Sequence, residues 1–216
     1  MIVNLSKLFQ FVVAVSSKYN IDESHSLGHS MRVFHFAEQI VNHEMACMET
    51  PHLLEKQKPI IHAAAILHDT CDKKYRVESE GLVEIRDLLL PMMPTDQIDA
   101  TVRIIEHMSY SKVTKYGMPN MGEYQTAFNA VREADLLDAY DFDRSMIYHF
   151  EKNRRTIENS YENAVELFEN RVLRHMDDGF LLTNYAKKMH PEFSQKARIR
   201  MNHWKNILKQ SPYYIT

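Results

Sequence analysis

The stretch AAAILHDTCDKKY, residues 63–75, contains the change of pattern that decides the fold. Ile61, Ala64 and His68 follow one another at steps of three and four residues, which places them on one face of a helix. Polarity rises sharply after Asp69, as it does where a helix runs into a loop. The pattern therefore predicts a helix with an apolar face that ends in a histidine and an aspartate.

Apolar residues recur at helical spacing on both sides of this stretch. The expected helices cover about residues 5–19, 27–48, 60–67, 81–90, 98–108, 123–139 and 144–175, and a last helix begins after Pro191. We expect Pro51 to end the second helix, Thr95 to be the N-cap of the fifth, and residues 111–122 to form a polar loop. No segment of the sequence alternates apolar and polar residues over the length of a strand. We therefore expect an all-α fold.

Length and composition favour a single domain. The chain has 216 residues, and its five glycines and seven prolines are few for a loop-rich or sandwich fold. No internal repeat or low-complexity segment marks a domain boundary. We expect one domain over residues 1–216, with its core at about residues 22–150 and the C-terminal helices, residues 151–216, packed on that core.

The charge balance favours a small partner. The 26 basic and 29 acidic residues are dispersed and give a formal net charge of −3, so no strong field attracts a nucleic acid polymer or an anionic membrane. No apolar run approaches the roughly 20 residues of a membrane span, and we interpret residues 1–17 as part of an amphipathic helix rather than a secretion signal. Cys47 and Cys71 cannot form a disulfide framework. A soluble, cytoplasmic monomer or homodimer fits these features.

Four ionisable residues lie on or beside apolar helical faces: His29, His68, Asp69 and Asp135. His29 precedes Val33 by four residues, and Asp135 follows Val131 by four. Taken singly, each is more often a hydrogen-bonded core residue. Together, two imidazoles and two carboxylates form a ligand set that can hold a divalent metal ion and leave positions for water and a substrate oxygen.

Three segments carry a family resemblance: SHSLGHSMRV, residues 24–33, AAAILHDTCDKKY, residues 63–75, and VREADLLDAYDFDR, residues 131–144. Their order and spacing resemble the H…HD…D pattern of HD-domain metal-dependent phosphohydrolases, over about residues 5–175. The resemblance implies a single-domain HD-type helical bundle. It also implies metal-dependent hydrolysis of a phosphate ester or anhydride, above all of a nucleotide or a related small phosphorylated metabolite.

The resemblance also implies a ligand set. It assigns the metal to His29, His68, Asp69 and a last aspartate in EADLLD, for which Asp135 is favoured over Asp138, one turn further on. His107 is the only histidine between Asp69 and Asp135, whereas dinuclear HD enzymes need two more there. We therefore expect one divalent metal ion, with manganese, iron, cobalt, nickel and magnesium all open.

Residues near the ligands are candidates for catalysis and substrate binding. Many HD hydrolases place an acidic residue three positions after the HD pair, where it activates the attacking water, and Asp72 lies there. An equally open interpretation is that Asp72 caps the helix end or pairs with Lys73 or Lys74. The substrate-binding candidates are His25, Arg32, Lys73, His107 and Arg144. The segment YDFD, residues 140–143, departs from the glycine-containing stretch common in bacterial members of the family.

Two other functions remain as alternatives. An HD-type iron oxygenase uses the same scaffold, but the number of histidines disfavours it. A non-catalytic metal- or nucleotide-binding regulatory module would also use this scaffold, although an intact set of four ligands favours an enzyme.

Overall fold

The structure, a computed structural model, describes residues 3–153 and 156–210, and these residues form helices and connecting turns without a strand. The helices are α1 (Leu5–Tyr19), α2 (Leu27–Cys47), α3 (Pro51–Leu67), α4 (Glu78–Leu89), α5 (Thr95–His107), α6 (Tyr110–Tyr116), α7 (Gln125–Asp138), α8 (Phe142–Asn153), α9 (Ile157–Asn170) and α10 (Asn184–Gln210). Four short 3₁₀ turns join them: η1 (Glu23–His25), η2 (His68–Cys71), η3 (Gly122–Tyr124) and η4 (Val172–Arg174). The expected all-α fold is confirmed.

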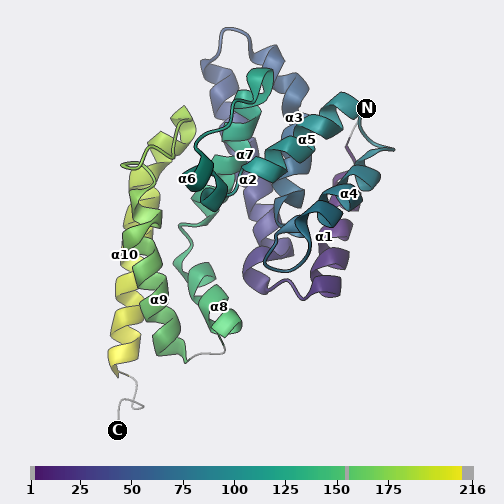
Figure 1. Cartoon of the computed structure of the whole chain (residues 1–216). Coiled ribbons are helices and arrows are strands. Elements are labelled where there is room, and N and C mark those ends of the chain that lie inside the picture. The colour runs from purple at the N-terminus through teal and green to yellow at the C-terminus, as the bar shows by residue number, and fades with distance from the viewer. Residues whose placement is uncertain (1–2, 154–155, 211–216) are drawn as a thin grey trace.

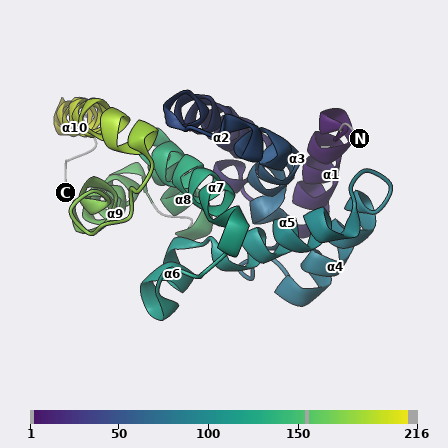
Figure 2. The same cartoon turned by 90° about the horizontal axis from the view of Figure 1, so that it is seen from above.

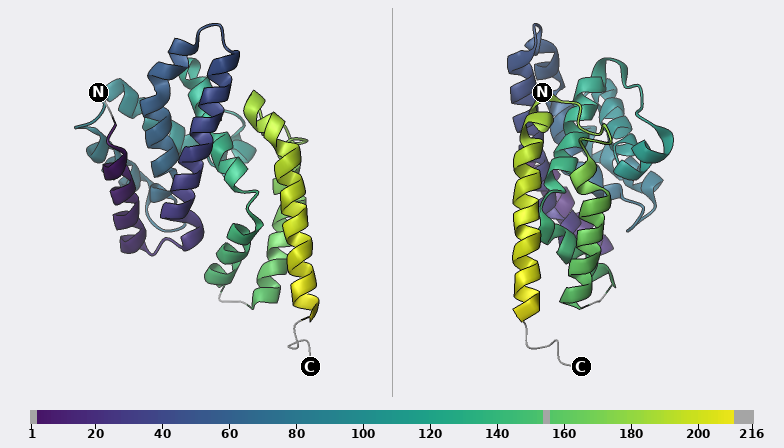
Figure 3. Two further views of the ribbon diagram at one scale, coloured as in Figure 1. Left: turned by 180° about the vertical axis from the view of Figure 1, so that it is seen from behind. Right: turned by 90° about the vertical axis from the view of Figure 1, so that its left-hand side faces the viewer.

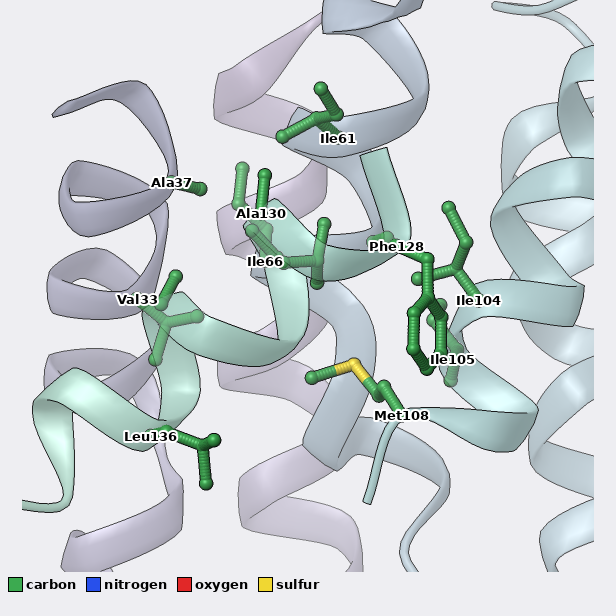
Figure 4. Packing of buried hydrophobic residues seen from close by; sticks show 14 of the residues in the cluster. Val33, Ala37, Ile61, Ile66, Ile104, Ile105, Met108, Phe128, Ala130 and Leu136 are labelled. Atoms are coloured by element: carbon green, nitrogen blue, oxygen red, sulfur yellow. The ribbon is translucent and has the colours of Figure 1, made fainter. Parts of the chain in front are cut away.

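Helices α2, α3 and α7 form the centre of the bundle, and each of them packs on the other two (Figures 1 and 2). Their contact is apolar: Val33 and Ala37 of α2, Ile61 of α3 and Phe128 of α7 are fully buried (Figure 4). Burial of a side chain such as Ile61 contributes roughly 1.5–3 kcal/mol. Helices α1 and α5 cover α3 on its other sides. The ends of α2, α3 and α7 are thereby held in fixed relative positions.

Helices α8, α9 and α10 lie together beside this centre, and α10 also contacts α2 and α7 (Figure 3). Two buried carboxylates anchor the start of α10. Glu44 of α2 accepts hydrogen bonds from Asn184 Nδ2 and Tyr185 N, both over 3.0 Å. Glu133 of α7 accepts bonds from the backbone nitrogen and the hydroxyl of Thr183. These polar contacts hold the C-terminal helices on the centre of the bundle.

The structure corrects two expected helix boundaries. Pro51 begins α3 and does not end α2, which stops at Cys47; proline suits the first turn of a helix, where its missing N–H leaves no bond unmade. The expected helix over residues 144–175 is two helices, α8 and α9. The reason is a local cap: the hydroxyl of Thr156 accepts a hydrogen bond from Asn159 N over 3.3 Å and starts α9 anew.

Three further boundaries differ from the sequence-based expectation. Helix α10 begins at Asn184 and continues through Pro191, at the loss of one backbone hydrogen bond. Residues 111–122, expected to be a loop, contain most of α6, which begins where the side chain of Ser109 caps Lys112 N. Thr95 is the first residue of α5, and Pro94 occupies the N-cap position. No helix within residues 3–153 and 156–210 is long and apolar enough to cross a membrane.

Candidate metal centre

Helices α2, α3 and α7 bring four ionisable side chains to one point. His29 lies in the first turn of α2 and is fully buried. Helix α3 runs directly into the tighter turn η2, which carries His68 and Asp69. The hydroxyl of Thr70 donates to a carbonyl at the end of α3 over 2.7 Å and so satisfies one of the acceptors that a helix end leaves free. Asp135 lies on α7, which packs on both other helices.

The ligand atoms of these four residues lie within a few ångströms of one another. His29 Nε2 is 3.0 Å from His68 Nε2, 3.2 Å from Asp69 Oδ2 and 3.4 Å from Asp135 Oδ1. His68 Nε2 is 3.4 Å from Asp69 Oδ1 and 3.8 Å from Asp135 Oδ1. Ligands bound at about 2.1 Å to one ion lie about 3 Å from their neighbours. The spacing of the four groups therefore fits a single metal ion.

Hydrogen bonds on the outer side of both imidazoles leave their Nε2 atoms facing the centre. His29 Nδ1 donates to Asp138 Oδ2 over 2.7 Å, and His68 Nδ1 donates to the carbonyl oxygen of Ala65 over 3.0 Å. Both acceptors lack a proton, so each Nδ1 carries a hydrogen and each Nε2 is the nitrogen left to bind a metal ion. Histidine ligands of metals are held in this way.

The electrostatics of the cluster favour a positive charge at its centre. Burial and Arg144 act to lower the pKa of His29, but hydrogen bonds to Asp135, Asp138 and Asp69 outweigh them and raise it to about 10. Burial opposes ionisation of Asp69, yet the nearby histidines hold its pKa well below the usual range. The Oδ2 atom of Asp69 is buried and, although it lies 3.2 Å from His29 Nε2, it makes no hydrogen bond of good geometry. A divalent cation fits this donor set, because it supplies both the charge and the missing partner.

Asp138 has a different place from Asp135. Besides accepting from His29, it accepts a hydrogen bond from Arg32 Nε over 2.7 Å at its other oxygen. Arg144 Nε lies 3.5 Å from Asp138 as well. Asp138 therefore orients the ring of His29 from behind, and the guanidinium of Arg32 is engaged there. Arg32, expected to bind substrate, does not line the pocket beside the ligands.

A pocket of about 410 Å³ opens beside the cluster, a volume in the range of small-molecule sites. Its walls include His68, Asp69 and Asp135 and four residues predicted from the sequence, His25, Asp72, Lys73 and Arg144. Three of the four proposed ligands and these candidates therefore share one cavity.

Arg144 lines the pocket and contacts one of the proposed ligands directly. Its Nε donates to the carbonyl oxygen of Ser24 over 2.6 Å, and this bond holds the Arg144 side chain against η1. Its Nη2 lies 3.2 Å from His29 Nε2. A guanidinium at this position can donate to an oxygen of an anion held at the ligands.

His25 is held by a small polar network. Its Nδ1 lies 2.7 Å from Ser24 Oγ and 3.1 Å from Asp22 Oδ1, while its Nε2 lies 3.3 Å from Lys74 Nζ. The hydroxyl of Tyr75 donates to the other oxygen of Asp22. These contacts fix the ring of His25 in the pocket wall. Sequence reasoning did not single out Asp22 or Tyr75.

Asp72 shows features of both interpretations left open by the sequence. Its Oδ1 accepts a hydrogen bond from Lys74 N over 2.8 Å, and its Oδ2 lies 3.3 Å from Lys74 Nζ. It is therefore the capping and pairing residue of this turn. It also lines the pocket together with His68, Asp69 and Asp135.

His107 does not reach this pocket, which corrects the expectation that it contacts the substrate there. Its Nδ1 donates to the carbonyl oxygen of Arg103 over 2.9 Å, and its side chain lines a second, separate cavity. The reason is the rotation of α5: Ile105 and Met108, three residues apart, line the first pocket, and His107 lies on another side of the helix.

The rest of the pocket wall includes residues that sequence reasoning missed. Tyr110 and Lys112 of α6, Tyr148 of α8 and Arg171 after α9 line it. They lie outside the three motif segments, and Lys112, Tyr148 and Arg171 belong to segments predicted as a loop or as one long helix. Only the tertiary arrangement of these elements around the pocket brings them near the ligands.

Comparisons with known proteins bear on the fold alone. No protein-family model matches the chain, and no curated protein matches it. Among solved structures, the chain resembles the crystal structure of a structural-genomics target from Lactobacillus plantarum. The two share 18% sequence identity, with a TM-score of 0.70 over 98% of this chain and 100% of the other. The likeness shows a shared fold over nearly the whole chain.

Proposed function

We propose that this protein is an HD-type metal-dependent phosphohydrolase that acts on a phosphate ester or anhydride of a nucleotide or a related small phosphorylated metabolite. One observation carries the proposal: the Nε2 atoms of His29 and His68 and the carboxylates of Asp69 and Asp135 converge, and a pocket that contains the guanidinium of Arg144 opens beside them.

The proposed chemistry divides between the metal and the chain. A divalent ion held by these four residues would lower the pKa of a bound water and neutralise phosphoryl charge. Asp72 lies on the pocket wall and is the proposed acceptor of the proton from the attacking water. Arg144 is fixed by Ser24 and would donate to a phosphoryl oxygen as negative charge develops there.

One metal ion, of manganese, iron, cobalt, nickel or magnesium, is the proposed cofactor. Among the described residues, the grouped ligands His29, His68 and Asp135, with Asp69 beside them, supply donors for one ion. His107, the remaining histidine of the relevant segment, lies at another cavity. This arrangement favours the hydrolase over the iron oxygenase.

The non-catalytic alternative has one observation in its favour. Lys74 engages both oxygens of Asp72, so the proposed base is partly occupied. A metal- or nucleotide-binding regulatory module would need the ligands and the pocket but not Asp72.

The cytoplasmic location also remains a proposal, supported by the free state of Cys47 and Cys71.

Metal analysis combined with a hydrolysis screen tests the proposed function. We expect the purified chain, supplied in turn with manganese, cobalt, nickel, iron or magnesium, to retain about one ion and to hydrolyse a member of a panel of nucleoside mono-, di- and triphosphates. Asp69→Ala should lose both properties. Asp87→Ala, a change of an exposed carboxylate on α4, should lose neither. A wild type that retains no ion, or an equally active Asp69→Ala variant, would refute the proposal.

A further inference from the structure

A second arginine lines the same pocket as Arg144. Arg171 directly follows α9, and its guanidinium carbon lies 3.7 Å from the centre of the Tyr110 ring. A guanidinium this close to an aromatic ring gains a cation–π attraction. The Tyr110 ring also stacks on Phe180, with ring centres 4.8 Å apart. The platform that holds Arg171 is therefore itself fixed.

In the described part of the chain, the guanidinium of Arg171 makes no polar contact with the protein. Lys73, another cation of the pocket, also has no polar partner there but is exposed, whereas Arg171 Nε is buried. Lys112 pairs with Glu78 over 2.5 Å, Lys74 with Asp72 over 3.3 Å, and Arg144 donates to the backbone of Ser24. Within residues 3–153 and 156–210, the guanidinium of Arg171 has no hydrogen bond and no carboxylate partner, and its Nε is buried. An arginine carries five N–H donors. A buried N–H donor that has no acceptor destabilises the fold.

The surroundings of Arg171 add an electrostatic reason to expect an anion. Burial lowers the pKa of Arg171, Asp135 and Tyr110 act against this, and Arg144 lowers it further. Arg171 therefore lies within electrostatic reach of both a metal-ligand candidate and the arginine beside the ligands. Two guanidinium groups that face one cavity repel each other, and an anion bound between them removes this repulsion.

We propose that Arg171, held on Tyr110, binds a second anionic group of the substrate, apart from the phosphate at the metal ligands. The proposal rests on the proposed function and narrows the substrate to molecules with at least two linked phosphate groups. The pocket, at about 410 Å³, is much larger than one phosphate needs. Arg144 serves the phosphate near His29, and Arg171 serves a neighbouring phosphate through its free N–H donors.

Binding of inorganic tripolyphosphate tests this proposal without any reaction. Calorimetric titration of the full chain in excess EDTA compares tripolyphosphate with inorganic phosphate. We expect wild type to prefer tripolyphosphate, and Arg171→Met, which keeps an apolar stem against Tyr110, to bind it about tenfold or more weakly, the loss of roughly one charge-assisted contact. Arg174→Met is the matched control, because Arg174 is exposed and pairs with Asp178 over 2.9 Å; it should bind as wild type does.

A structural role alone would give other results. Thermal melts of each variant identify loss of folding, and if Arg171→Met unfolds, Arg171→Lys replaces it, with a smaller but measurable loss of tripolyphosphate binding. The proposal is overturned if wild type does not prefer tripolyphosphate, if the folded Arg171 variant binds it as wild type does, or if Arg174→Met loses binding equally.

The outcome separates this inference from the proposed function. A chain that binds tripolyphosphate through Arg171 but retains no metal and hydrolyses nothing would uphold the anion site and refute the phosphohydrolase. An active enzyme whose KM for di- and triphosphates is unchanged by Arg171→Met would uphold the hydrolase and overturn the anion site.

Discussion

His29 Nδ1 lies 2.7 Å from Asp138 Oδ2, and this contact connects the most deeply buried metal-ligand candidate to a carboxylate that lies outside the ligand set. Asp138 is itself held by Arg32 Nε over 2.7 Å. The three groups form a chain from the surface, where Arg32 is 44% exposed, to the fully buried imidazole. The ring of His29 therefore cannot turn without breaking its bond to Asp138, and Arg32 holds that carboxylate in place.

We expect Asp138→Asn to weaken metal binding while leaving the four proposed ligands in place. The asparagine amide is close to the carboxylate in size, but it lacks the negative charge that makes the His29 imidazole a stronger metal ligand. Loss of such an outer partner typically lowers metal affinity about 10- to 100-fold. Competition with a fluorescent chelator measures the change. Asp99→Asn, on the exposed Asp99–Arg86 pair, is the control, and unchanged affinity in Asp138→Asn would show that the contact does not support the ligand.

The helical fold could be predicted because its pattern is local. Apolar spacing predicts the central helices, and the structure confirms the all-α fold. The wrongly predicted helix boundaries lie where a single polar side chain determines the start of a helix. Thr156 starts α9 inside a segment predicted as one long helix, and Ser109 starts α6 next to a segment predicted as a loop. Such a cap contributes only about 1 kcal/mol. It depends on one polar residue, so the spacing of apolar residues does not reveal it.

The candidate site was predictable to the extent that it follows from motifs. Their positions on apolar helical faces, together with the resemblance to the H…HD…D pattern, predict His29, His68, Asp69 and Asp135, and the structure brings these residues together. The roles of Asp138 and Arg32 could not be assigned, because a residue one turn from a ligand shares its helical face and only tertiary packing decides which one faces the centre. Arg171 and Tyr110 carried no motif at all.

Two variants separate the open interpretations of Asp72. If Asp72 accepts the proton from water, Asp72→Asn should lower kcat by about 10²- to 10⁴-fold and leave metal content unchanged. Lys74→Met, which removes the ion pair at Asp72 Oδ2 but keeps the carboxylate, should retain most of kcat. Steady-state kinetics on the hydrolysed nucleotide gives both values. Similar small effects in both variants would assign Asp72 to the turn alone.

Gly81 lets α4 lie directly on the turn that carries His68 and Asp69. A Cβ atom at Gly81 would lie 2.4 Å from Cys71 Cβ and 2.9 Å from Cys71 Cα, closer than such atoms can approach. We expect Gly81→Ala to lower the free energy of unfolding by about 1–3 kcal/mol, the usual cost of overpacking. Urea denaturation measures it.

Gly28→Ala is the matched control for Gly81→Ala. Gly28 also lies in a helix, but its added Cβ would meet only Arg32 Nη1, at an ordinary 3.5 Å. Its free energy of unfolding should therefore change little or rise slightly, since alanine has the higher helix propensity. Equal stability of the two variants would mean that α4 moves away from Cys71 without cost.

His175 makes the stability of the fold sensitive to acid. It is completely buried, neither ring nitrogen has a hydrogen-bond partner, and its ring centre lies 5.8 Å from those of both Tyr110 and Tyr140. Burial, with help from Arg171, lowers the pKa of His175 from 6.5 to about 3. Between these two pH values the unfolded chain binds a proton at His175 that the folded chain does not. The free energy of unfolding therefore has its full value, as far as His175 is concerned, above pH 6.5, and it falls as the pH drops below 6.5.

Replacement of His175 by phenylalanine should remove this dependence. In wild type, His175 should contribute a fall in the free energy of unfolding of up to about 1.4 kcal/mol per pH unit below its unfolded-state pKa. Urea denaturation at pH 7 and pH 5 should therefore give a smaller difference for His175→Phe than for wild type. His52→Phe, at an exposed histidine of α3, should keep the wild-type difference. A His175→Phe variant with the full acid sensitivity would show that other groups cause it, because phenylalanine binds no proton in either state.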